Sequence, residues 1–278
     1  MAFPTTPKAP KEIPMTHYIP KFTVPKSAPK EIYKPGLVSI SFRNNTQREI
    51  LTMMKSAGLS YIEWGSDVHA PHRSLGMLSE LSQLQAQYGV SCCSYGTYFR
   101  LGETPTDELN YYISAAKALG TDVLRLWAGR KCGKDMSISE LDKFMDSCWR
   151  AVEIAERENV KLCLECHDKT FTERLDDALM LMENADSDKF RMYWQPFRDR
   201  SVDENLEYLE TVEKYVEHIH VFNWDATNRY PLADAIPTWK RYLSKLSRPR
   251  MMLLEFMPDN ELSSLPAEAN ALREIIKM

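Results

Sequence analysis

Four residues of types that commonly bind metal ions follow short apolar runs in the second half of the chain. They are Glu165 in LCLECHD, Gln195 in MYWQPF, His220 in HIHVFNW and Glu255 in LLEFMP. Their spacings of 30, 25 and 35 residues each fit one strand and one helix, so the four side chains can meet at one end of a parallel barrel. Two carboxylates, an imidazole and an amide oxygen suit one divalent ion. Mn²⁺ is the preferred candidate, and Mg²⁺, Co²⁺ and Zn²⁺ are alternatives.

Structural roles for the same side chains compete with this interpretation. Taken alone, Glu165 or Glu255 could equally be a buried charge paired with an arginine inside the barrel. Two unneutralised carboxylates buried together cost several kcal/mol, which favours a shared cation. His218 shares strand parity with His220 but lies deeper, so we expect it to be an imidazole of the core or one that supports the metal ligands from behind. Cys163 and Cys166 form a CxxC whose members project to opposite strand faces, which disfavours a thiolate site.

Short apolar runs alternate with longer amphipathic stretches from Gly36 onward, as in repeated strand–helix units. We expect strands at residues 37–42, 61–65, 90–95, 122–128, 160–166, 190–195, 218–224 and 251–256. We expect helices near 46–57, 75–88, 106–119, 138–158, 173–184, 202–215, 233–246 and 265–277, with helix starts signalled at Thr106 and Ser137. Eight such units predict an α/β fold, a (β/α)₈ TIM barrel over residues 36–278. A doubly wound sheet is disfavoured because no glycine-rich turn follows the first strand.

Residues 1–35 have a different composition from the rest of the chain. They hold eight of the sixteen prolines, and six lysines against two glutamates. Such a segment is not expected to form helix or central strand, so we predict an extended or mobile Pro/Lys-rich N-terminal arm. Its apolar residues, among them Phe3, Tyr18 and Phe22, could anchor it on its own barrel or on a neighbouring subunit of a homo-oligomer.

Composition and charge limit the binding partners and the cellular location that we expect for this protein. The whole chain carries a formal charge of −4, and residues 36–278 alone carry −8, which disfavours a general nucleic-acid binder. No run of about 18 apolar residues and no secretory signal is found, so we expect no membrane partner and a cytoplasmic protein. Six dilute cysteines are expected to be reduced thiols.

The sequence resembles the xylose isomerase-like TIM barrels, the sugar phosphate isomerases and epimerases. The resemblance is carried in order by LVSISFR (37–43), YIEWGSDVHAP (61–71), YGTYFRLG (95–102), LRLWAG (124–129), LCLECHD (162–168), YWQPF (193–197), HIHVFNW (218–224) and LLEF (253–256). It implies metal ligands Glu, Asp, His and Glu at the ends of strands five to eight, which fall on the four residues named above, with Gln195 departing from Asp. It also implies substrate contacts for Arg198, in place of a histidine, and for Arg229.

Other side chains at the expected strand ends suit a polyhydroxylated, small-molecule carbohydrate substrate. Aromatic rings can stack on sugar C–H surfaces, and polar groups can bond hydroxyls or move protons. The candidates are Trp64, Tyr95, Tyr98, Trp127, Trp224, His69, Arg125 and His167.

The leading hypothesis is a metal-dependent isomerase or epimerase acting on a sugar or keto-sugar through a metal-stabilised enediolate. Glu165 and Glu255 would be the catalytic proton-transfer pair as well as metal ligands. A dehydratase or lyase using the same metal site is the alternative, because its first half-reaction is shared. An apurinic endonuclease and a non-catalytic sugar-binding barrel are weaker alternatives.

Overall fold

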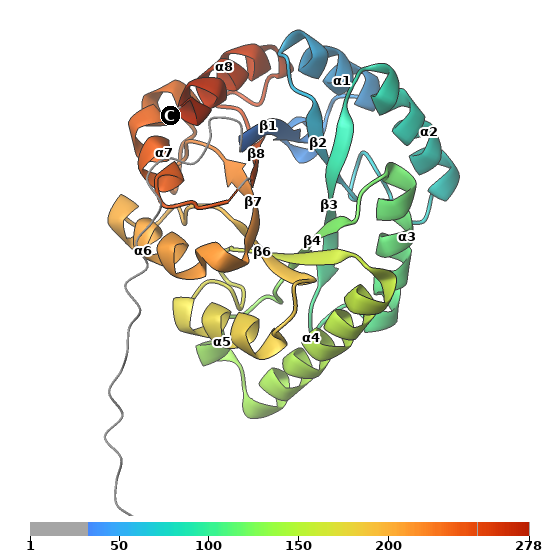
Figure 1. The fold of residues 1–278 in the computed structure, drawn as a ribbon, viewed down its shortest axis with the longest axis vertical. Helices are drawn as coiled ribbons and strands as arrows, with labels where there is room; N and C mark the ends of the chain where they lie inside the picture. The colour runs from blue at the N-terminus through green and yellow to red at the C-terminus, as the bar shows by residue number, and fades with distance from the viewer. Residues whose placement is uncertain (1–32, 249, 278) are drawn as a thin grey trace, which may run out of the picture.

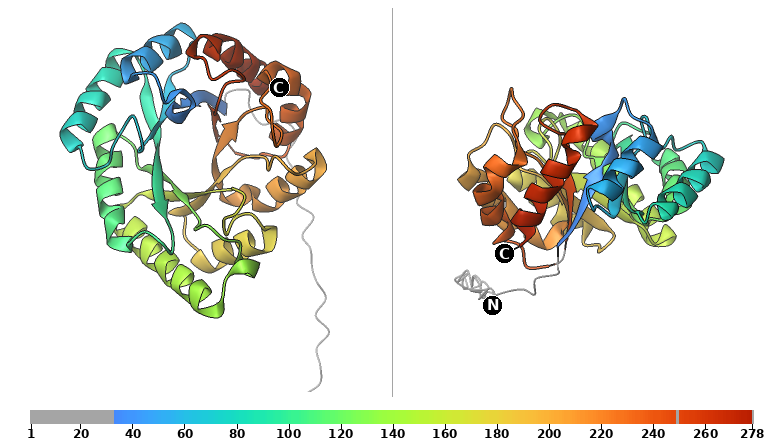
Figure 2. Two further views of the ribbon diagram at one scale, coloured as in Figure 1. Left: turned by 180° about the vertical axis from the view of Figure 1, so that it is seen from behind. Right: turned by 90° about the horizontal axis from the view of Figure 1, so that it is seen from above.

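The computed structural model describes residues 33–248 and 250–277, which form a closed barrel of parallel strands inside a ring of helices (Figure 1). Each strand pairs with its sequence neighbours, and β1 closes the barrel by pairing with β8. The helices enclose the strands in the reverse view as well (Figure 2). The prediction of a (β/α)₈ TIM barrel is confirmed, whereas residues 1–32 of the predicted arm lie outside the described residues. Among the described residues, no helix has the length and apolar character needed to cross a membrane.

The strands are β1 (Tyr33–Val38), β2 (Tyr61–Gly65), β3 (Ser91–Arg100), β4 (Val123–Trp127), β5 (Lys161–Glu165), β6 (Phe190–Trp194), β7 (Val216–Val221) and β8 (Arg250–Leu254). The α-helices are α1 (Gln47–Ser56), α2 (Leu75–Gln87), α3 (Leu109–Leu119), α4 (Ile138–Glu158), α5 (Leu175–Ala185), α6 (Val202–Val212), α7 (Ile236–Leu243) and α8 (Leu265–Ile276).

The first strand lies earlier than its predicted range of 37–42. β1 begins at Tyr33, and Ser39–Phe42 form a short 3₁₀ helix instead. Three residues assigned to the arm therefore belong to the barrel, and Pro35 stands inside a strand. The missing N–H of Pro35 is tolerated because β2 pairs with β1 only from Gly36 onward, while β8 pairs from Tyr33.

Capping interactions explain where several helices begin. Ser137 precedes α4, as predicted, and forms a reciprocal capping box with Glu140; Thr46 and Ser201 do the same for α1 and α6. The predicted start at Thr106 is wrong by three residues. Thr106–Glu108 form a 3₁₀ turn without a side-chain cap, and α3 begins at Leu109.

The barrel interior is built in layers. One layer is a buried cluster of mainly apolar residues that includes Val123, Cys163, Tyr193 and Leu253. Two residues after these stand Arg125 and Glu165, within β4 and β5, and Gln195 and Glu255, directly after β6 and β8. Alternate residues of a strand face the same side, so a layer of polar side chains lies above the apolar one, toward the carboxyl ends of the strands.

Candidate functional site

The four predicted metal ligands lie together at the carboxyl end of the barrel. Nδ1 of His220 lies 3.5 Å from Oε1 of Glu165, 3.5 Å from Oε2 of Glu255 and 3.4 Å from Oε1 of Gln195. All four residues are buried. Ligand atoms of Glu165, His220 and Glu255 lie within 4.8 Å of one another. The sequence prediction of which side chains converge is therefore matched by the geometry.

These distances fit a divalent cation. A tetrahedron with metal–ligand bonds of about 2.1 Å has edges of about 3.4 Å, which is the separation between the His220 nitrogen and the three oxygens. The donor set is also suitable, because imidazole and carboxylate ligands serve Zn²⁺ and Mn²⁺. The other imidazole nitrogen, Nε2, is buried without a hydrogen-bond partner and lies 3.8 Å from Oε1 of Glu63. A carboxylate beside the outer nitrogen of a metal-binding histidine is a common way of fixing its orientation.

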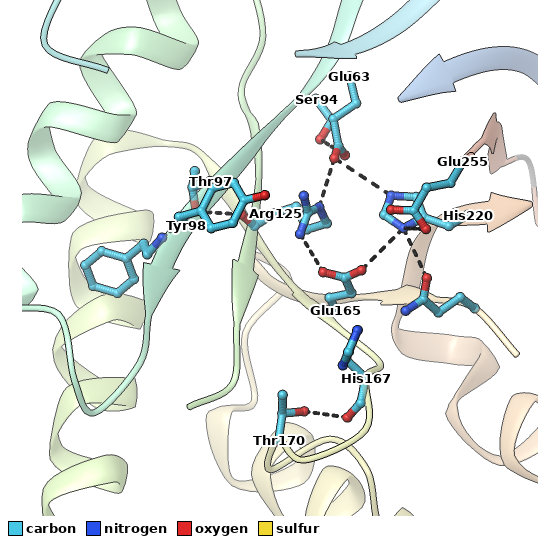
Figure 3. Close-up of polar contacts among 12 residues, drawn as sticks. Glu63, Ser94, Thr97, Tyr98, Arg125, Glu165, His167, Thr170, His220 and Glu255 are labelled. Carbon is cyan, nitrogen blue, oxygen red and sulfur yellow. Dashed lines mark hydrogen bonds and ion pairs between the residues drawn. The ribbon is translucent and has the colours of Figure 1, made fainter. Parts of the chain in front are cut away.

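Arg125 connects two of the buried carboxylates (Figure 3). Its Nε donates to Oε1 of Glu63 at 2.8 Å, and its Nη1 donates to Oε2 of Glu165 at 2.5 Å. All three side chains are almost completely buried. The arginine pairing weighed from the sequence therefore exists, and it coexists with the convergent donor set. Substrate binding by Arg125 was the expectation, but its guanidinium is engaged with Glu63 and Glu165.

Glu63 was missed by the sequence reasoning. It stands in the middle of YIEWG on β2, has no exposed surface, and accepts a 2.8 Å hydrogen bond from the Ser94 hydroxyl as well as the bond from Arg125. The available signal was a lone carboxylate in an otherwise apolar and aromatic strand. Gly96 leaves the room for this pair, because a Cβ there would lie 2.5 Å from Oε1 of Glu63 and 2.9 Å from Nη2 of Arg125.

The buried charges perturb one another strongly. Burial raises the pKa of Glu63 and of Glu165, but Arg125 and His220 outweigh burial and hold both pKa values below their ordinary range. Burial lowers the pKa of His220, but Glu255, Glu165 and Glu63 together raise it to about 10. Burial also raises the pKa of Glu255, and the neighbouring carboxylate of Glu165 adds to the effect. Arg125 and His220 therefore favour the charged forms of Glu63 and Glu165, whereas burial disfavours the charged form of Glu255.

A pocket of about 460 Å³ opens above this layer. Its lining includes the predicted residues Tyr98, Arg125, Trp127, His167, Arg198 and Trp224. Arg229 lines an adjacent pocket of about 290 Å³. Aromatic walls and a polar floor are the usual composition of a site for a small molecule.

Three predicted substrate contacts lie away from this pocket. Trp64 is fully buried and donates from Nε1 to Gln85 on α2, which places it outside the barrel wall. Tyr95 donates to the carbonyl of Ala70 and packs against α3. His69 is held by Ser39 and by the carbonyl of Asn45.

Strand parity explains two of these errors. Trp64 follows Glu63, so the two face opposite sides of β2 and only Glu63 faces the interior. On β3 a register shift after Cys92 changes which residues face inward, and Tyr95 turns outward.

The positions of His218 and of the cysteines agree with what the sequence led us to expect. His218 is buried one layer below His220, bonded to the carbonyls of Glu217 and Cys93 and packed edge-on against Tyr193. Cys163 lies in the interior cluster and Cys166 in the cluster outside the barrel, as expected for opposite faces. All six cysteines are free.

Phe256, directly after Glu255, has an unusual backbone. Its φ is 57°, in the left-handed region that side chains rarely adopt. Its N–H donates to the Ser41 hydroxyl at 2.8 Å, and its ring packs 4.9 Å from that of Trp224. Backbone strain of this kind is concentrated at functional sites, and here it turns the chain so that the aromatic ring lines the pocket beside Glu255.

Solved structures with the same fold include sugar-processing enzymes and metal-binding proteins. The probable 3-DHS dehydratase AsbF of Bacillus anthracis, involved in petrobactin synthesis, aligns with a TM-score of 0.73 at 17% identity, over 86% of this chain and 98% of that one. The IOLI protein, solved with a bound zinc atom, aligns with a TM-score of 0.69 at 14% identity, over 87% and 98%. An L-ribulose 3-epimerase aligns with a TM-score of 0.63 at 14% identity, over 86% and 93%.

These identities are low, so the alignments show a shared fold. No protein with a curated description matches the chain in sequence. A family profile, however, matches residues 51–275, most of the barrel and all four of the convergent donor residues. On this match, the chain belongs to the xylose isomerase-like TIM barrel family.

Proposed function

We propose that this protein is a metal-dependent isomerase or epimerase that acts on a sugar or keto-sugar through an enediolate. The observation that carries the proposal is the position of His220 Nδ1, which faces three oxygens at 3.4–3.5 Å on the floor of a pocket with aromatic walls. Family membership is consistent with this chemistry.

One divalent ion, Mn²⁺ in the first instance, would be held by Glu165, Gln195, His220 and Glu255. Bound there, such an ion polarises a carbonyl and stabilises the negative charge that develops when the neighbouring C–H loses its proton. Gln195 is neutral where the family pattern has aspartate, so its amide oxygen would be a weaker donor than a carboxylate.

The two glutamates are not equivalent as bases. Glu165 uses Oε2 to accept from Arg125 and turns Oε1 toward His220. Glu255 turns Oε2 toward His220, while its Oε1 has no donor among the described residues. Glu255 therefore has an oxygen free to take a proton from substrate, and burial keeps its basicity high. Glu165 is the second member of the pair, with Oε1 facing His220 and Oε2 held by Arg125.

The pocket walls would orient the substrate. Trp127 and Trp224 offer faces for the C–H surface of a sugar, and Tyr98 and His167 offer groups that can bond hydroxyls. Arg125 would act indirectly by holding Glu165 in place rather than by touching the sugar.

A dehydratase or lyase is the alternative, supported by the similarity in fold to a probable dehydratase. Both reactions begin with removal of a proton next to a carbonyl, and they diverge when a β-oxygen leaves. The chemistry of the site serves either outcome.

The test combines metal analysis with proton exchange. Protein purified without chelator is expected to contain one divalent ion per chain, and loss of the ion after Glu165→Ala or His220→Ala would support the assignment. Incubation with a panel of ketoses and keto-acids in D₂O, followed by NMR, should show deuterium at one carbon. An epimer or isomer identifies the leading reaction, and a new double bond identifies the alternative. Protein without bound metal and without exchange on any substrate would instead favour the non-catalytic sugar-binding barrel.

A further inference from the structure

Two serines in the short 3₁₀ helix after β1 bond to the backbone of the neighbouring strand ends. The hydroxyl oxygen of Ser39 accepts from the N–H of Gly65, the last residue of β2, at 2.9 Å. The hydroxyl oxygen of Ser41 accepts from the N–H of Phe256, two residues after the end of β8, at 2.8 Å. Both serines are buried. Their side chains therefore act where the backbone of a longer β1 would have offered carbonyl acceptors.

The bond from Ser41 reaches a strained position of the chain. Phe256 has a φ of 57°, and this left-handed region is unfavourable for a bulky side chain. Such a conformation persists only where the surrounding structure holds it. Here the N–H is bonded to Ser41, and the ring packs 4.9 Å from that of Trp224. Without the hydroxyl, the N–H would lose its acceptor and the residue could return to an ordinary φ.

Glu255 lies directly before this position, so its carboxylate depends on the same turn. Its N–H donates to the carbonyl of Val221 at the end of β7, at 3.0 Å. The next N–H along the chain is the one that Ser41 accepts. Between these two bonds, the side chain of Glu255 places Oε2 3.5 Å from Nδ1 of His220. A change of φ at Phe256 rotates the peptide between the two residues, which moves the backbone that carries the carboxylate.

The side chain of Glu255 has fewer restraints than those of the other two buried glutamates in this layer. Arg125 donates a hydrogen bond to Glu63 and another to Glu165. Among the described residues, His220 is the only basic group within 4.0 Å of the Glu255 carboxylate. The direction of this carboxylate therefore depends mainly on its backbone.

We propose that Ser41 is a positioning residue that holds Glu255 in the orientation in which it can bind a metal ion and take a proton. The hydroxyl supports the left-handed turn at Phe256, and the turn directs the carboxylate toward His220. Ser41 acts through the backbone and is neither a ligand nor a proton carrier. This inference rests on the proposed function, because that function gives Glu255 its part in the reaction.

Ser41→Ala tests the assignment, and Ser147→Ala is the matched control. Ser147 on α4 is also buried, and its hydroxyl accepts from the N–H of Gly102, another residue with a left-handed φ, at 3.0 Å. Both variants lose one bond of the same kind, so both should lower the melting temperature. Only Ser41→Ala should weaken Mn²⁺ binding, by about tenfold, as is typical for partners behind metal ligands. It should also lower kcat for deuterium exchange with little change in KM.

A second substitution separates positioning from a simple loss of stability. Glycine adopts the left-handed region without strain, so Phe256→Gly keeps the turn accessible without the hydroxyl. In that background, Ser41→Ala should change Mn²⁺ affinity by less than about threefold, because the two sites are coupled through the turn. An equal loss of affinity with phenylalanine and with glycine at position 256 would contradict the inference.

Crystal structures grown with chelator test the positioning without metal. In Ser41→Ala, residue 256 should leave the left-handed region, and Oε2 of Glu255 should no longer lie 3.5 Å from Nδ1 of His220. An unchanged turn and carboxylate, or wild-type Mn²⁺ affinity and kcat in this variant, would overturn the inference. Wild-type protein that binds no divalent ion would refute the proposed function, whereas the two crystal structures would still test the role of Ser41.

Discussion

Replacing Glu63 with glutamine isolates the contribution of the buried pair that was not predicted from sequence. The variant keeps the shape of the side chain and removes one charge, so Arg125 loses its partner at 2.8 Å but keeps Glu165 at 2.5 Å. Breaking a buried ion pair costs about 3–5 kcal/mol. Because Arg125 keeps one partner, we expect the free energy of unfolding to fall by about 3 kcal/mol, the lower end of that range. At about 2–4 °C per kcal/mol, the melting temperature of the metal-free protein should fall by roughly 6–12 °C.

Metal affinity should decrease in the same variant. The buried polar side chains beneath the pocket lose one negative charge, because the carboxylate beside Nε2 of His220 becomes a neutral amide. Changes to such outer partners typically cost about 10–100-fold in affinity. The assays are thermal unfolding in chelator and a Mn²⁺ titration of the same preparation.

Glu268→Gln provides the control. Glu268 is also buried, but it lies on α8 and accepts from the backbone N–H of Leu232. Its substitution should reduce stability without changing metal affinity. If Glu63→Gln left both the melting temperature and the metal affinity at wild-type values, the buried network would have no energetic role and the reasoning would be refuted.

Four further predictions concern the metal and the proton. Glu255→Gln should slow deuterium exchange into substrate by about 10²-fold or more with metal still bound, and Glu165→Gln should slow it less; the reverse order in an NMR exchange assay would assign the base to Glu165. His220→Ala should abolish metal binding measured by titration, whereas His218→Ala should lower the melting temperature and leave binding intact. Because the pKa of His220 is raised to about 10 in the metal-free protein, the imidazole is protonated at pH 7 and a metal must displace that proton. Affinity should therefore rise with pH up to about 10, and calorimetry in buffers of different ionisation enthalpy should detect the released proton; none released would contradict the protonated state. Gln195→Asp should tighten Mn²⁺ binding, and an unchanged affinity would show that residue 195 is not a ligand.

The strand ends were predictable because each β–α unit carries its own local signals. Apolar runs of strand length stop at Glu165, Gln195 and Glu255, and amphipathic stretches follow each of them. Parallel strands put their carboxyl ends on one side of the barrel, so the convergence of these residues needed no knowledge of tertiary packing.

The inward-facing residues were harder to predict. A barrel strand is buried on both faces, so β2 shows no alternation of apolar and polar residues that would separate Glu63 from Trp64. On β3 the register shift after Cys92 changes the parity of Tyr95. Which residue of a strand faces the interior depends on the tertiary partner of its side chain. For Glu63 that partner is Arg125, 62 residues away.

The position of Arg229 could not be derived from local pattern either. It lies in a loop, and its orientation depends on Trp224, Phe256 and Asn260, which come from two different loops. The first strand shows a related limit: the proline at position 35 argued against a strand, and only the late start of β2 pairing makes it acceptable.

The neutral residue at position 195 is consistent with the charges around it. Glu63, Glu165 and Glu255 oppose the single guanidinium of Arg125, which leaves two negative charges when His220 is neutral. A divalent ion balances that number. An aspartate at 195 would leave this group of buried side chains with one negative charge in excess. Glutamine retains an oxygen 3.4 Å from His220 Nδ1 without adding that charge, so the departure from the family pattern suits a site in which one divalent ion balances the buried carboxylates.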